Sequence, residues 1–225
     1  MNVTSQRTTF ENELTELQRD LLRMGSLVEE AVFNAVQSLV TRDEVLAKKV
    51  MMNDDQIDAL CKEIEKRCVR LVATQQPIAR DLRIIFTGIK IISNLERMGD
   101  HAVDIARYAL NLIICYSSTV ADIILQDILQ ISRMVQQMVK NGLDAYVHND
   151  VTRAREMSGA DDEVDHLYRK TFNAILDLME KEPGNTRCYV YLLLAALRLE
   201  RVADRATNIG EDVIYLVTGE WEELN

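Results

Sequence analysis

An internal duplication is the feature of this 225-residue chain that most limits how it folds. The segment MMNDDQID at 51–58 resembles SGADDEVD at 158–165, which lies 107 residues further on. The segment LERMGD at 95–100 resembles LERVAD at 199–204, at a spacing of 104 residues. Repeats at a nearly constant spacing indicate that one structural unit is used twice. We therefore expect two similar halves.

Each half is predicted to contain three long helices. Apolar residues recur every three or four positions, which is the period of an amphipathic helix, and no segment shows the sustained alternation of a strand. The chain has only 2 prolines, Pro77 and Pro183, at corresponding places in the two halves. Pro77 is expected to start a helix, and Asp43 to cap one. The predicted fold class is all-α, with two pseudo-symmetric three-helix bundles at 1–117 and 118–225, joined at Ser117-Ser118. The helices are expected at about 10–40, 44–73, 77–116, 119–147, 151–179 and 185–217.

Composition limits the kinds of partner that this chain can have. Its formal net charge of −10 argues against nucleic acid, which requires a basic surface, but leaves open metal cations, basic proteins and plain solubility. The polar N-terminus has no apolar signal-peptide core, and the longest apolar stretch, 188–197, is well short of the ~20 residues that span a bilayer. We expect a cytoplasmic protein that reaches a membrane only through its partners.

Carboxylates lie beside the apolar stripes in both halves. Asp100 falls about 40° from Glu96 on a helical wheel, and both project from the apolar face of their helix. Asp58 precedes Pro77 by 19 residues and Glu96 follows it by 19, so an antiparallel hairpin places them at the same height. Asp54 and Asp100 match in the same way. The predicted quartets are Asp54, Asp58, Glu96 and Asp100 in the first half, and Asp161, Asp165, Glu200 and Asp204 in the second.

Four clustered carboxylates repel one another, so a positive charge should accompany them. Oxygen ligands suit divalent or trivalent metal ions, and iron, zinc, manganese and magnesium all stay open. The alternatives are a solvated acidic groove, or neutralisation by Arg97, Arg107 or Arg201. Arg97 and Arg201 point about 100° away from the carboxylates, which disfavours them. The residues expected at the rim of a metal site are His101, Asp104 and Asn208.

The sequence offers no catalytic motif. A glycine-rich phosphate loop and a nucleophile elbow are both missing. The Glu-x-x-His at 163–166 has the ligand spacing of di-iron bundles, but its counterpart at 56–59 lacks both ligands. We therefore expect a protein that is not an enzyme. The alternative is a metal-dependent enzyme or metal store that uses the acidic clusters.

Two regions resemble the signatures of the PhoU family. QQPIARDLR at 75–83, with KIISNLERMGDHA at 90–102, resembles the first signature, and LERVADRATNIG at 199–210 resembles the second. The resemblance extends over nearly the whole chain. It implies a fold of two three-helix bundles, with metal ions bound at the paired E/D-x-x-x-D motifs.

The resemblance also implies a function. A PhoU-type protein represses phosphate-starvation signalling when phosphate is ample, through a sensor histidine kinase (PhoR) and the ATPase subunit of the phosphate transporter (PstB). A homodimer is a further expectation. Two residues depart from the signatures, since Arg205 replaces a usual histidine and Asp104 a usual asparagine. Arg205 adds a positive charge beside Asp204, so the first quartet is expected to bind metal more readily than the second.

Overall fold

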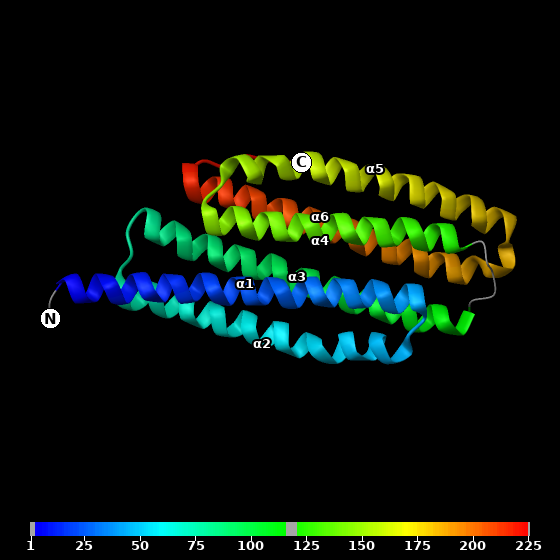
Figure 1. Cartoon of the computed structure of the whole chain (residues 1–225), viewed down its shortest axis with the longest axis horizontal. Helices are drawn as coiled ribbons and strands as arrows, with labels where there is room; N and C mark the ends of the chain where they lie inside the picture. Colours follow the sequence, from blue (N-terminus) through cyan, green and yellow to red (C-terminus); the bar gives the residue numbers. More distant parts are fainter. Residues whose placement is uncertain (1–2, 116–120, 225) are drawn as a thin grey trace.

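The structure, a computed structural model, describes residues 3–115 and 121–224 and is almost entirely helical over them (Figure 1). No strand occurs in these two ranges. Long helices run roughly parallel to the long axis of the molecule. The elements are α1 (Val3–Thr41), α2 (Glu44–Gln75), α3 (Arg80–Cys115), α4 (Ala121–His148), α5 (Val151–Lys181), the short 3-10 helix η1 (Pro183–Asn185) and α6 (Thr186–Thr218).

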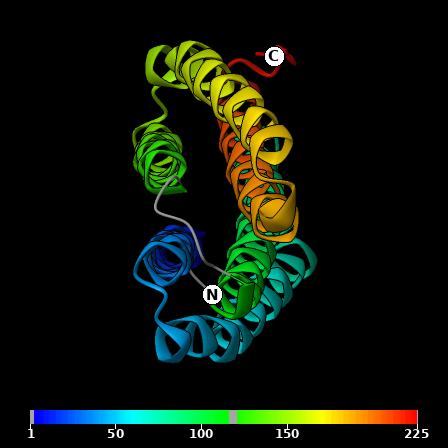
Figure 2. The same cartoon turned by 90° about the vertical axis from the view of Figure 1, so that its right-hand side faces the viewer.

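The helices form two stacked three-helix units (Figure 2). Helices α1, α2 and α3 pack together in one unit and α4, α5 and α6 in the other, while α3 packs on α6 and α1 on α4 across the stack. One apolar core runs through both units and includes the fully buried Leu95 and Leu199. The predicted all-α fold of two pseudo-symmetric three-helix units is confirmed. The expected junction at Ser117-Ser118 lies outside the described residues.

The turn that enters the second helix of each unit is repeated closely. Asp43 accepts a hydrogen bond from the backbone N–H of the third residue along at 2.9 Å, and Asp150, 107 residues later, does the same at 3.0 Å. The residue before each cap, Arg42 or Asn149, has a left-handed φ of 57° or 53°. The predicted cap at Asp43 is therefore confirmed, and the duplication extends to the backbone of the turn.

Neither proline starts an α-helix. Helix α3 begins at Arg80, so the expectation that Pro77 starts it is wrong. Gln76 and Ala79 both have left-handed φ angles, 47° and 45°, and the chain completes this turn before the helix can begin. Pro183 starts η1 only, and α6 follows it.

The segment after α6 folds back over the end of the seam between α3 and α6. Trp221 stacks on Tyr215 with ring centroids 4.0 Å apart, and the ammonium of Lys90 lies 4.0 Å from the Trp221 ring. Glu222 pairs with Arg155 of α5 at 2.8 Å. These contacts join α3, α5 and α6. Among the described helices, none has an apolar run of the length and hydropathy that a bilayer crossing requires.

Candidate functional site

The first quartet lies where α2 and α3 approach closely. Asp54 and Asp58 project from α2, Glu96 and Asp100 project from α3, and all four are half-buried. The Asp54 Oδ1 atom lies only 3.3 Å from the place where a Cβ would stand on Gly99, so Asp54 contacts α3 beside Asp100. Burial raises the pKa of Asp54 to about 6, and the charges of Asp58, Asp100 and Glu96 add to the shift. The hairpin therefore brings the four carboxylates into electrostatic contact.

The second quartet repeats this arrangement between α5 and α6. Burial raises the pKa of Glu200 to about 7, with further repulsion from Asp204, Asp165 and Asp161. Burial, and then Asp204, raises the pKa of Asp161 to about 6, although a hydrogen bond with Thr207 opposes the shift. Burial followed by Asp165 also raises the pKa of Asp204. In both units, the carboxylates of the two helices repel one another.

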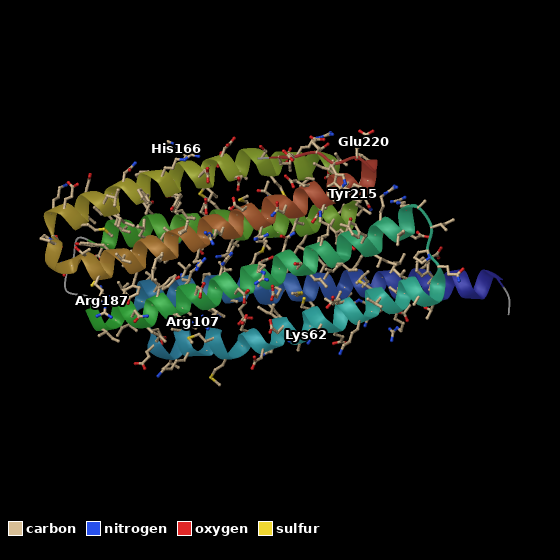
Figure 3. All side chains as sticks on the ribbon, turned by 180° about the vertical axis from the view of Figure 1, so that it is seen from behind. Lys62, Arg107, His166, Arg187, Tyr215 and Glu220 are labelled. Atoms are coloured by element: carbon tan, nitrogen blue, oxygen red, sulfur yellow. The ribbon has the colours of Figure 1, made fainter. Side chains whose placement is uncertain are left out.

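Basic side chains partner several of these carboxylates. Arg97 approaches Asp100 at 3.0 Å and Glu96 at 3.5 Å, and Lys62, labelled in Figure 3, approaches Asp58 at 3.7 Å. Our interpretation that Arg97 points too far away is wrong, because its long side chain reaches both the adjacent Glu96 and Asp100, one turn further along α3. Across residues 3–115 and 121–224, no three acidic, histidine or cysteine side chains are arranged to hold a metal ion as they stand. Metal binding would require Arg97 and Lys62 to move aside.

The second quartet is partnered differently. Arg169 binds Asp165 at 2.5 Å, whereas no carboxylate of the described residues lies within ion-pair distance of Arg201 or Arg205. Both of these arginines still lower the pKa of Asp204 through space, against the larger effects of burial and Asp165. Arg205 therefore adds positive charge near Asp204, as expected, without forming an ion pair with it.

The three expected rim residues lie at the seam between α3 and α6. His101 and Asn208 line a polar cleft there, together with Arg201, Asp204 and Arg205. Asp104 does not line it. Its carboxylate binds Arg198 of α6 at 3.0 Å and Arg107 at 3.2 Å.

Burial lowers the pKa of His101 to about 4, and Arg198 and Arg201 add to this effect. His101 thus faces the arginines of α6. His166 is exposed on the outer side of α5, away from α6, and takes no part in either quartet (Figure 3).

Sequence reasoning missed two features of this seam. The first is the row of Arg198, Arg201 and Arg205, whose i, i+3 and i+7 spacing shows that they share a helix face. The second is the ion pair between Lys90 and Asp212. The Asp212 side chain is 1% exposed, and burial raises its pKa to about 6 against the opposing effect of Lys90. Asp212 sits among apolar residues of α6, and that position was the available signal.

Comparisons with known proteins match this architecture. The family model described as "PhoU domain" matches twice, at residues 21–109 and 128–213. The two starts are 107 residues apart and the two ends 104, which are the spacings of the internal repeat. A curated relative from Clostridium acetobutylicum, the phosphate-specific transport system accessory protein PhoU homolog, is 41% identical over 220 residues, 97% of this chain and 99% of its own.

Solved structures of PhoU proteins have a similar fold. The crystal structure of PhoU from Pseudomonas aeruginosa matches with a TM-score of 0.87 at 36% identity, covering 94% of this chain and 100% of that one. The phosphate transport system regulatory protein PhoU from Streptococcus pneumoniae matches with a TM-score of 0.86 at 30% identity, covering 95% and 99%.

Proposed function

Because the chain belongs to the PhoU family, we propose that it is a regulatory accessory protein of a phosphate-specific transport system. The observation that carries this proposal is similarity along nearly the entire length, both to a relative named as such an accessory protein and to a solved regulatory protein. The protein would act in the cytoplasm and repress phosphate-starvation signalling when phosphate is ample. Its partners would be the sensor histidine kinase (PhoR) and the transporter ATPase subunit (PstB).

An exposed apolar stripe supports a role in binding proteins. Leu82 and Phe86 lie four residues apart near the start of α3 and are 44% and 45% exposed, and Ile78, in the turn just before α3, is 78% exposed. Phe86 also contacts Tyr215, which stacks on the exposed Trp221. Exposed apolar groups that gather on one face are typical of protein interfaces. A partner or a second copy of this chain would bury them.

We also propose that the carboxylate quartets bind metal ions as part of this regulator, once the basic side chains beside them move aside. Burial, followed by repulsion from neighbouring carboxylates, raises the pKa values of Asp54, Asp161 and Glu200. A divalent or trivalent cation (iron, zinc, manganese or magnesium) would offset this repulsion through oxygen ligands. Asp54, Asp58, Glu96 and Asp100 would hold one ion, and Asp161, Asp165, Glu200 and Asp204 another. Bound metal would tie α2 to α3 and α5 to α6.

The same acidic sites would also suit a metal-dependent enzyme or a metal store. The comparisons favour the regulator, because the curated relatives are named accessory proteins and not enzymes. A reporter of a phosphate-starvation promoter tests the choice in a strain that lacks this protein. We expect the reporter to be switched on in phosphate-rich medium and switched off again when the wild-type gene is restored. An unchanged reporter in the deletion strain would contradict the proposal.

A further inference from the structure

A polar cleft lies on the seam where the two repeat units meet, between α3 and α6. Its lining residues include His101 from α3 and Arg201, Arg205 and Asn208 from α6. Arg205 and Asn208 also line a second hollow further along the same seam. Figure 3 views the molecule from the side on which α3 and α6 cross its middle. The cleft thus lies between the α2–α3 and α5–α6 hairpins, and it shares Asp204 with the second carboxylate quartet.

The cleft is rich in guanidinium groups that lack carboxylate partners. Arg201 and Arg205 are four residues apart on one face of α6, and no carboxylate of the described residues lies within ion-pair distance of either. One turn earlier, Arg198 binds Asp104, yet its Nε atom is buried without a hydrogen-bond partner. In a chain with a formal net charge of −10, carboxylates are abundant, so unpaired arginines gathered in one cleft are unexpected. Their free N–H groups favour an anion.

Comparison of the two repeats shows that the unpaired arginines lie on α6 and not at the matching positions of α3. At the repeat spacing of 104 residues, Arg97 corresponds to Arg201, but Arg97 is tied to Asp100. At the same spacing Asp104 corresponds to Asn208, so an acid in the first unit is an amide in the second. Each difference leaves α6 with more free hydrogen-bond donors toward the cleft than α3 has at the matching position.

We propose that this cleft binds inorganic phosphate through Arg201 and Arg205, with Asn208 and His101 as additional hydrogen-bonding groups. The planar guanidinium fork matches two oxygens of a tetrahedral oxyanion. Asp204 also lines the cleft, and its carboxylate can accept a hydrogen bond from the protonated oxygen of hydrogen phosphate. Sulfate carries no proton at neutral pH and would be repelled by the same carboxylate. The site therefore selects phosphate over sulfate.

This inference goes beyond the proposed regulatory function and does not depend on metal at the quartets. Isothermal titration calorimetry of the full chain, kept in chelator and free of phosphate and sulfate, tests it with inorganic phosphate as the titrant. We expect saturable binding that Arg205→Gln and Arg201→Gln each weaken by about tenfold or more, because a charge-assisted hydrogen bond is lost. Arg205→Lys should give a smaller loss, since it keeps the charge but not the fork.

The matched control is Arg19→Gln, an exposed arginine of α1 paired with Glu16. It should leave phosphate binding unchanged. Sulfate should bind more weakly than phosphate to the wild type, and Asp204→Asn should narrow that difference. Thermal melts of each variant establish that it is folded. The proposal is overturned if chelated protein shows no saturable phosphate binding, if Arg19→Gln weakens binding as much as Arg205→Gln, or if sulfate binds as tightly as phosphate.

Discussion

Single residues determine how this protein responds to pH, and Glu200 is the clearest case. Burial raises its pKa from 4.5 to about 7, and Asp204 and Asp165 add repulsion. A carboxyl group with a raised pKa binds its proton more tightly in the folded chain than in the unfolded chain. Its contribution to folding is therefore favourable at low pH, and is lost as the pH rises from about 4.5 to about 7. The pKa of His101 is lowered, so its contribution to folding depends on pH in the opposite direction. The contribution of Glu200 alone is therefore measured by comparing a Glu200 variant with the wild type.

We predict that Glu200→Gln gains stability relative to the wild type as the pH rises. In metal-free protein the two should differ less at pH ~5 than at pH ~7.5, because the amide never becomes charged. Urea denaturation at the two pH values measures the difference. Glu163→Gln, an exposed substitution on α5, is the control and should show little change between them. A Glu200→Gln advantage that shrinks with rising pH would refute the assigned direction of the shift.

Arg97 provides a second test at the residue scale. It approaches both Glu96 and Asp100 and is 58% exposed, so its ion pairs contribute at most about 1 kcal/mol to folding. We predict that Arg97→Gln changes the melting temperature little but strengthens manganese binding at the first quartet, because a competing positive charge is gone. Calorimetric titration with manganese measures this affinity. Weaker manganese binding in the variant would show that Arg97 supports the site instead of competing for it.

At the scale of elements, the sequence predicted the helices well and their ends less well. The apolar period set the number and order of the helices, and capping chemistry identified Asp43. Helix α1 nevertheless begins at Val3, before the predicted start at Phe10, because polar residues give no periodic signal. The start of α3 was missed because left-handed φ angles at Gln76 and Ala79 do not follow from the presence of Pro77.

The repeated caps give a prediction at this scale. Asp43→Ala and Asp150→Ala should each lower the free energy of unfolding by about 1 kcal/mol, because each leaves a helix N–H group without its acceptor. The start of α2 and the start of α5 lie at opposite ends of the molecule (Figure 1), so the effects of the two caps should add in the double variant. Asp43→Asn and Asp150→Asn keep an acceptor oxygen and are the matched controls. Urea denaturation checks the values, and equal losses in the alanine and asparagine variants would contradict the role of the caps.

At the scale of the whole molecule, two repeat units behave as one body. Leu199 of α6 is fully buried in a core that runs through both units, and Arg83 of α3 donates a hydrogen bond to the Leu216 carbonyl at 3.1 Å. The sequence could predict which carboxylates come near one another, because that depends on one hairpin in each unit, and their binding of metal stays a prediction. It could not show the cleft of Arg201 and Arg205, because that depends on which faces of α3 and α6 meet.

This shared core predicts cooperative unfolding. Leu199→Ala should lower the free energy of unfolding by about 2–5 kcal/mol through loss of buried contacts and a residual cavity. Calorimetry should show a single transition that shifts as a whole. Leu176→Ala, at a 40% exposed site on α5, is the control and should have a much smaller effect. Two separate transitions, only one of which moves in Leu199→Ala, would show that the units fold independently.

We propose that both carboxylate quartets are metal sites of a PhoU-type regulator, and metal content tests that proposal directly. Protein purified without chelator is analysed for iron, zinc, manganese and magnesium, alongside Glu96→Ala/Asp100→Ala and Glu200→Ala/Asp204→Ala variants whose melting curves show that they are folded. We predict metal in the wild type and a loss in each double variant, larger for the first quartet. Wild-type protein without bound metal, or metal content that both double variants retain in full, would contradict the account.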